Sequence, residues 1–166
     1  MAPASGSPVP VLRPLRWWDL EAVHALEREL FGPTAWSPEA FWGELAQRNR
    51  TLLVAEADGA VLGYAVAVVN GADADVQTIG VAPAAQGRGT GRSLLRALLA
   101  AAARAGATRM LLEVRADNEQ ALALYRSEGF EQIARRRGYY QPGDHDAVIM
   151  RAPLRPDLPA GASASS

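Results

Sequence analysis

Apolar and polar positions alternate along the chain in a way that predicts strands and helices in turn. Runs rich in Val, Ile and Leu are typical of strands, whereas apolar residues spaced three or four apart are typical of helices. The expected strands cover residues 9–15, 51–57, 60–69, 75–81, 109–114, 131–139 and 147–151. The expected helices cover residues 18–30, 37–47, 91–105 and 118–128. In the third helix one stripe is apolar and should be buried: Leu94, Leu95, Leu98, Leu99 and Ala102.

Turn and capping residues separate these segments. Ser37 followed by Pro38 is a typical helix start, because Ser caps free backbone N–H groups and Pro fits the first helical turn. Asp19 is a candidate cap for the first helix. Asp58-Gly59 between two β-rich runs is a strong hairpin signal. These signals support the element boundaries given above.

The order of the elements predicts a mixed α/β fold. The strand–helix–strand unit over residues 75–114 should form a parallel, right-handed crossover, and the earlier and later strands should form hairpins. We expect one domain over residues 9–152. Residues 1–8 and 153–166 are rich in Pro, Gly, Ala and Ser, which favours disordered tails.

Composition excludes several kinds of chemistry. With 49% hydrophobic and 21% charged residues, the 166-residue chain can bury a core, and its net charge of -1 disfavours a nucleic-acid-coating protein. There are no cysteines and two histidines, so we expect no metal site. There is no lysine, which excludes Schiff-base and Walker-type chemistry. No apolar run approaches the ~20 residues of a membrane span, and no secretion signal is visible, so we expect a cytoplasmic location.

A glycine-rich loop joins the strand at 75–81 to the following helix. Gly87, Gly89 and Gly91 allow backbone N–H groups to turn inward, and the helix adds free donors and the positive end of its dipole. This arrangement predicts a cradle for phosphate, with Arg88 and Arg92 adding charge. The alternative is a turn that only lets strand and helix pack closely.

A second block of polar residues lies downstream of the glycine-rich loop. Glu113 is the single carboxylate of an apolar strand. Asn118 and Tyr125 are seven residues apart and share a helix face, two turns apart. Taken one at a time, they are more readily interpreted as a solvated edge carboxylate, a capping amide and a core phenol, and taken together with the glycine loop these interpretations are weaker.

The two blocks together resemble the GNAT superfamily of acetyl-CoA-dependent N-acetyltransferases, over residues 12–152. The matching motifs are Gln86-x-x-Gly89-x-Gly91 and Asn118-x-x-Ala121-x-x-Leu124-Tyr125-x-x-x-Gly129-Phe130. Further segments are similar to the RimI branch, whose members acetylate the N-terminal alanine of a small-subunit ribosomal protein: Phe31, Trp36-Ser37, Phe41, Leu112-Glu113-Val114-Arg115, Arg136-Arg137-Gly138-Tyr139-Tyr140 and Asp146-Ala147-Val148-Ile149-Met150. Two positions depart from the pattern: Gly80 stands where Ala or Ser is common, and Gly87 where a basic residue is common.

The resemblance implies a mechanism and a set of site residues. Acetyl-CoA is the implied co-substrate, without a metal, and the acceptor amine attacks it directly in a ternary complex. Glu113 is the implied base, Tyr125 the implied acid, and the N–H near Val81 would polarise the thioester carbonyl. The implied cofactor contacts are Ile79, Gly80, Val81, Gly87, Arg88, Gly89, Thr90, Gly91, Arg92 and Asn118.

The sequence says less about which residues contact the acceptor. Trp36, Tyr139 and Tyr140 are candidates for contacts with the acceptor peptide, and core packing is the alternative for Trp36. The arginines at 135–137 fit a solvated strand edge, and we expect no nucleic-acid binding and a monomer. Two other functions stay open: acetylation of a small amine or of lysine, and acetyl-CoA binding without catalysis as an interaction subunit.

Overall fold

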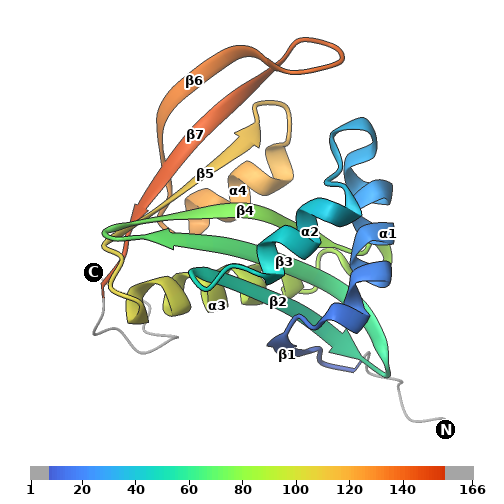
Figure 1. Ribbon diagram of the computed structural model, residues 1–166. Helices are drawn as coiled ribbons and strands as arrows, with labels where there is room; N and C mark the ends of the chain where they lie inside the picture. Colours follow the sequence, from blue (N-terminus) through green and yellow to red (C-terminus); the bar gives the residue numbers. More distant parts are fainter. Residues whose placement is uncertain (1–7, 156–166) are drawn as a thin grey trace, which may run out of the picture.

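The computed structural model describes residues 8–155 and confirms a mixed α/β fold (Figure 1). The strands are β1 (Val11–Pro14), β2 (Arg50–Ala57), β3 (Ala60–Asn70), β4 (Asp73–Val81), β5 (Arg109–Arg115), β6 (Glu131–Tyr140) and β7 (His145–Pro153). The α-helices are α1 (Leu20–Phe31), α2 (Pro38–Leu45), α3 (Thr90–Arg104) and α4 (Glu119–Ser127). Short 3-10 turns precede α1 (η1, Trp17–Asp19), follow it (η2, Gly32–Thr34) and follow β4 (η3, Pro83–Ala85). Element ends therefore lie close to those that the sequence predicts.

The seven strands form one sheet in the order β1-β2-β3-β4-β5-β7-β6. All neighbouring pairs are antiparallel except β4 and β5, which are parallel and are joined through α3. This confirms the expected parallel crossover over residues 75–114.

β4 and β5 are paired along only three residues of each strand. Asp73, Ala74 and Asp75 pair with Arg109, Met110 and Leu111, and beyond this point the two strands separate, as Figure 1 shows. β4 also carries a β-bulge directly after the paired segment, because Val66 pairs with Thr78 and Ala67 with Val76, which leaves Gln77 as the extra residue. The sheet therefore opens into a wedge between the C-terminal halves of its two central strands.

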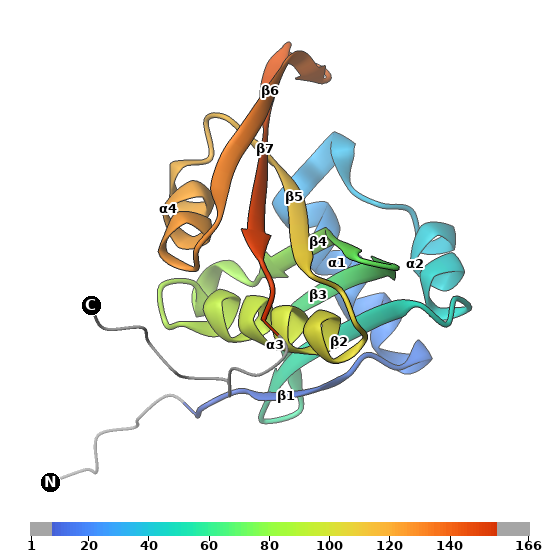
Figure 2. The ribbon, with the colours of Figure 1, turned by 90° about the vertical axis from the view of Figure 1, so that its left-hand side faces the viewer.

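Helices cover both faces of the sheet (Figure 2). One face packs against α3 and α4, and the expected stripe of α3 is buried there except for Leu99, which is half-buried. The other face packs against α1 and α2 through a second cluster that includes Val23, Phe41 and Tyr64. Within residues 8–155, no helix combines the length and the apolar character that crossing a membrane requires.

Two local sequence signals are confirmed. The Ser37 hydroxyl accepts a hydrogen bond from the Ala40 N–H at 3.2 Å and caps α2. Asp58 and Gly59 take φ angles of 52° and 78° at the β2–β3 turn, the left-handed region that a tight hairpin needs and that Asp and Gly tolerate.

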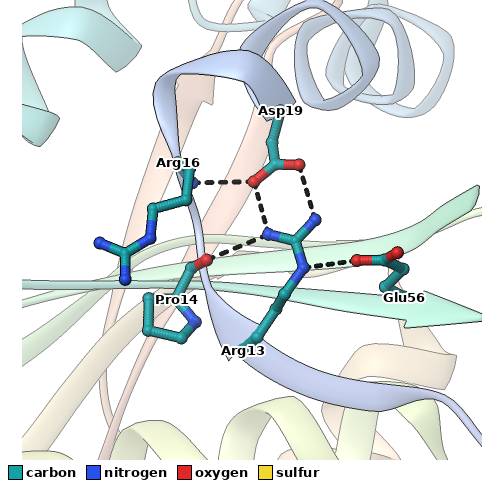
Figure 3. A network of polar contacts seen from close by, with 5 residues as sticks. All are labelled: Arg13, Pro14, Arg16, Asp19 and Glu56. Carbon is teal, nitrogen blue, oxygen red and sulfur yellow. Dashed lines mark hydrogen bonds and ion pairs between the residues drawn. The ribbon is translucent and has the colours of Figure 1, made fainter. Parts of the chain in front are cut away.

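Asp19 stands at the start of α1, but its carboxylate turns back toward the preceding strand (Figure 3). It makes no cap to α1; it accepts hydrogen bonds from the Arg16 N–H at 2.8 Å and from both terminal nitrogens of Arg13 at 2.7 and 2.8 Å. Arg13 is also paired with Glu56 on β2. Asp19 thus connects β1 to the turn before α1.

The C-terminal boundary of the domain differs from the expected one. β7 continues through Pro153, which pairs with Arg109, and Leu154 is buried, with its N–H donating to the Thr108 carbonyl at 2.8 Å. Apolar packing of Leu154 adds two residues to a domain expected to end at 152. Of the tails expected at 1–8 and 153–166, residues 1–7 and 156–166 lie outside the described residues.

Candidate active site

A cavity of about 580 Å³ fills the wedge between the separated strands. Its walls come from α1 and the loop after it, from β4, from β5 and the loop after it, from α4 and from the end of β6. The lining residues are Glu27, Leu30, Phe31, Thr34, Trp36, Val76, Gln77, Thr78, Ile79, Leu112, Glu113, Val114, Arg115, Asp117, Asn118, Ala121, Tyr125 and Tyr140. Because α1 and α4 cover opposite faces of the sheet, the cavity connects the two faces.

Glu113 faces this cavity from β5. Its neighbours Leu112 and Val114 are buried in the core beneath α3 and α4, so strand alternation turns Glu113 to the opposite face. The side chain keeps 35% of its exposure, and an Oε atom lies 3.7 Å from a terminal nitrogen of Arg136 on β6. Residues 135–137 are exposed on the edge strand β6, as the solvated-edge interpretation predicts, and Arg136 additionally lies near Glu113.

Tyr125 reaches the cavity from α4, on the other face. It is 6% exposed and its ring packs against Phe130, with 5.8 Å between the ring centroids. Burial, with a smaller contribution from Tyr140, raises the pKa of Tyr125 to about 12. The phenol therefore stays protonated across the neutral pH range and can act as a hydrogen-bond donor.

Tyr140 interacts electrostatically with both Glu113 and Tyr125. Its pKa is raised by burial first, then by the charge of Glu113 and by Tyr139, and Tyr140 in turn affects Tyr125. Tyr139 does not line the cavity; its ring lies 5.2 Å from that of Tyr140 and 5.2 Å from the Arg136 guanidinium carbon. Of the two tyrosines, only Tyr140 is part of the cavity wall.

Asn118 lines the cavity and begins α4. Its side-chain oxygen accepts a hydrogen bond from the Ala121 N–H at 3.2 Å, so the capping alternative is correct for this atom. The cap fixes the start of the helix that carries Tyr125.

Two glycines of the glycine-rich loop adopt left-handed backbone conformations. Gly87 and Gly89 have φ angles of 76° and 84°, and Gly89 is the N-cap of the 15-residue helix α3. The first N–H groups of an α-helix have no acceptor within the helix, so those of α3 are available to an anion. Residues 80, 81 and 87–92 do not line the cavity. A Cβ placed on Gly91 would lie 3.5 Å from Val81 and 3.7 Å from Leu124, so the start of α3 packs between the end of β4 and α4.

Arg92 binds side chains at the end of α4, whereas the sequence suggested a charge directed at the glycine-rich loop. Its guanidinium donates to the Ser127 hydroxyl at 2.9 Å and pairs with Glu128, which also binds Arg96 at 3.0 Å. Arg92 therefore ties the start of α3 to the end of α4, and it shares the carboxylate of Glu128 with Arg96.

The N–H of Val81 points toward the gap between β4 and β5. The Ala82 N–H donates to the Leu62 carbonyl at 2.8 Å on the β3 side, and hydrogen-bonded positions alternate along an antiparallel pair. The adjacent Val81, opposite Gly63, therefore directs its N–H away from β3. This is the edge from which β5 has separated.

Sequence reasoning missed Glu27 as a site residue. It is 2% exposed on α1, lines the cavity and accepts a hydrogen bond from the Trp36 N–H at 3.2 Å. The only signal in the sequence is a carboxylate on the buried stripe of an amphipathic helix. Among residues 8–155, no group of three or more His, Cys, Asp or Glu side chains is arranged to hold a metal ion.

Comparison with known proteins agrees with this geometry. Residues 16–130 match the model of the acetyltransferase (GNAT) family. The chain is 46% identical over 138 residues to the N-alpha-acetyltransferase RimI of Mycobacterium tuberculosis, covering 80% of this chain and 85% of that protein. It is 36% identical to the [ribosomal protein bS18]-alanine N-acetyltransferase of Salmonella typhimurium, covering 82% and 92%. The crystal structure of the ribosomal-protein-S18-alanine N-acetyltransferase from Escherichia coli superposes with a TM-score of 0.80 at 31% identity, covering 87% of this chain and 94% of that one. This chain belongs to the acetyltransferase (GNAT) family.

Proposed function

We propose that this chain transfers the acetyl group of acetyl-CoA to the α-amino group of a protein N-terminus, with the N-terminal alanine of a small-subunit ribosomal protein as acceptor. The observation that carries this proposal is the cavity through the sheet, with the carboxylate of Glu113 on one face and the buried phenol of Tyr125 on the other. Two substrates that meet from opposite faces need such a passage. The names of the Salmonella typhimurium and Escherichia coli relatives support this acceptor, and that of the Mycobacterium tuberculosis relative supports an α-amine.

The start of α3 is suited to the phosphates of acetyl-CoA. Free N–H groups, the helix dipole and the left-handed Gly87 and Gly89 together favour an anion at residues 87–92. Acetyl-CoA supplies the acetyl group as a thioester. Ile79 and Asn118 line the cavity beside that route, and the N–H of Val81 points to where the thioester carbonyl would accumulate negative charge.

Glu113 and Tyr125 divide the proton transfers. An acceptor amine must lose a proton before its nitrogen attacks the thioester carbon, and Glu113 takes that proton directly or through one water. As the carbon–sulfur bond breaks, the hydroxyl of Tyr125 donates to the leaving sulfur and protonates it. An α-amino group has a pKa of about 7.7–8.0 against about 10.4 for lysine, so deprotonation at pH 7 costs about 1–1.4 kcal/mol against about 4.6. A single exposed carboxylate suits the α-amine better.

The acceptor side is formed by Trp36 and Tyr140, which line the cavity near Glu113. Tyr139 would act at its rim. We further infer that the chain works in the cytoplasm, where a ribosomal acceptor is made, and that it works as a monomer.

Mass spectrometry tests the acceptor directly. Ribosomal proteins and a peptide library are incubated with the chain and acetyl-CoA, and each acetylated nitrogen is located. We expect acetylation of peptides that begin with Ala, and none of the same peptides when the α-amine is blocked but an internal lysine is present. Transfer to lysine or to small amines only, or binding of acetyl-CoA without transfer to any amine, would contradict the proposal.

A further inference from the structure

The carboxylate of Glu27 accepts hydrogen bonds from three separate segments of the chain at the wall of the cavity. One oxygen of its carboxylate accepts from the Trp36 N–H at 3.2 Å. The other accepts from the Tyr64 hydroxyl and from the Thr78 hydroxyl, the latter at 3.2 Å. Trp36 lies in the loop between α1 and α2, Tyr64 on β3 and Thr78 on β4.

Burial of this carboxylate is costly for the fold. Glu27 is 2% exposed, and the three partners named above are neutral groups. A buried carboxylate without an opposite charge depends on its hydrogen bonds, and an apolar residue of similar size is often at least as stabilising at such a place. Stability alone is thus a weak reason for a Glu at this position.

The groups that Glu27 holds form two walls of the cavity. Thr78 follows the β-bulge at Gln77 and belongs to the segment of β4 that has separated from β5. Trp36 approaches from the loop after η2 and packs on Phe41, with 5.1 Å between the ring centroids. Both residues line the cavity on the α1 side, the face to which Glu113 also turns.

We propose that Glu27 is a positioning residue for the acceptor: its carboxylate fixes the Trp36 loop and the bulged part of β4 at the separation in which the acceptor N-terminus binds. This inference rests on the proposed function, since it concerns the amine side of the same cavity. Glu27 acts through Trp36 and Thr78 and does not itself take part in the proton transfers.

The missing side chain at Gly80 makes this arrangement possible. A Cβ on Gly80 would lie 2.6 Å from the Tyr64 hydroxyl oxygen and 2.8 Å from Leu30 Cδ1, closer than Cβ contacts found in proteins. The space above Gly80 therefore lets the Tyr64 phenol reach Glu27. A Gly80→Ala substitution should displace Tyr64 and reproduce the effect of removing its hydroxyl.

Loss of Glu27 should affect binding of the acceptor more than binding of acetyl-CoA. The proposed phosphate contacts at residues 87–92 lie outside the cavity wall that Glu27 holds. Loosening the Trp36 loop should raise the KM for an acceptor peptide about tenfold, whereas the Kd for acetyl-CoA should change by less than about twofold. A general loss of stability would weaken the binding of the acceptor and of acetyl-CoA together.

The test compares Glu27→Ala, Glu27→Gln, Tyr64→Phe and Thr78→Val with the control Glu29→Gln, which makes the same chemical change at an exposed position of α1. Glu27→Gln keeps the shape and an acceptor oxygen for the Trp36 N–H, so it should recover most of the acceptor affinity lost in Glu27→Ala. Tyr64→Phe and Thr78→Val each remove one hydroxyl and should give intermediate KM values. The control should match the parent chain.

Amide hydrogen exchange at Trp36 provides a readout that does not depend on turnover. We expect faster exchange of this N–H in Glu27→Ala and Tyr64→Phe, with acetyl-CoA binding by calorimetry unchanged. If the parent chain acetylates no amine, the proposed function fails and the acceptor role of Glu27 fails with it, whereas the Trp36 exchange still shows separately whether Glu27 holds this loop in place. Unchanged Trp36 exchange, or equal losses of acceptor and acetyl-CoA binding, would overturn the positioning role. If Glu27→Ala does not fold, the hydroxyl variants decide by the same two measurements.

Discussion

Arg92 on the first turn of α3 is paired with Glu128, which directly follows α4, although its place beside the glycine loop suggests a phosphate ligand. Glu128 also binds Arg96, and its side chain is only 9% exposed. Burial alone would raise the pKa of Glu128, but Arg96 and Arg92 outweigh burial and hold it below its usual value. One carboxylate therefore neutralises much of two positive charges near the proposed phosphate site.

Glu128→Gln should strengthen acetyl-CoA binding at low salt. The amide keeps the shape of Glu128 but leaves the two arginines uncompensated, and a charge near a helix end contributes about 0.3–1 kcal/mol. We expect a two- to threefold lower Kd by calorimetry, which disappears near 1 M salt because the screening length falls to about 3 Å. Glu131→Gln on β6 makes the same charge change and serves as the control. An unchanged Kd at low salt would show that Arg92 and Arg96 do not act on the phosphates.

Gly89→Ala should damage acetyl-CoA binding more than it damages the fold. A Cβ at Gly89 meets no atom within 4 Å, so its cost comes from the φ angle of 84°, about 1–2 kcal/mol for a non-glycine residue. Gly71→Ala is a matched control, since its φ angle is 63° with equally open space at the β3–β4 turn. Both variants should lose similar stability in thermal unfolding. Only Gly89→Ala should raise the Kd for acetyl-CoA, about fivefold or more, and equal Kd values in the two variants would argue against a cradle at this loop.

Tyr125→Phe should lower kcat about 10²- to 10⁴-fold, the usual contribution of a positioned proton donor. Phe keeps the packing against Phe130, so the melting temperature and the Kd for acetyl-CoA should stay near those of the parent chain. Because the pKa of Tyr125 is about 12, the parent enzyme should not lose this donor below about pH 11. A kcat within threefold of the parent value would remove Tyr125 from the mechanism.

Much of the fold follows from local sequence patterns, whereas the contacts of the site depend on residues far apart in the chain. Ser37-Pro38 and Asp58-Gly59 fix their elements by short-range chemistry, and both were predictable. Helical periodicity predicted a helix over residues 18–30 but carries no information about the partners of Glu27, namely Tyr64 and Thr78, which are 37 and 51 positions away. The pairing of Arg92 with Glu128 spans 36 positions and was missed for the same reason.

Glu113→Gln should change the pH dependence of the reaction. Without a local proton acceptor, the rate should follow the fraction of neutral amine, which increases through a pKa of about 7.7–8.0. We therefore expect a large loss of kcat/KM at pH 7 and a smaller one at pH 9, measured with a peptide that begins with Ala. Glu119→Gln, at an exposed position in the first turn of α4, is the control. A variant profile parallel to that of the parent chain would place the base elsewhere.

Asp19→Asn should reduce stability in a pH-dependent way. The paired hydrogen bonds from Arg13, reinforced by the Arg16 N–H, hold the pKa of Asp19 below its usual value near 3.9 despite burial. A carboxyl whose pKa is lower in the folded state contributes its full stabilisation above the unfolded value, and this contribution is lost as the pH falls through the folded value. At pH 7 the variant should lose about 1.5–3 kcal/mol in denaturant unfolding, the range for hydrogen bonds to charged groups.

As the pH falls below the usual pKa of an Asp carboxyl and toward the lowered pKa of Asp19, the stabilities of the parent and Asp19→Asn chains should converge, because the parent loses the contribution of the charged carboxylate. Asp58→Asn is a suitable control, since Asp58 is exposed at the β2–β3 turn and Asn tolerates its φ angle of 52°. It should leave the unfolding free energy within about 0.5 kcal/mol of the parent. A deficit of Asp19→Asn that is constant between pH 7 and pH 2 would mean that packing, and not the charge held by Arg13, is what the fold loses.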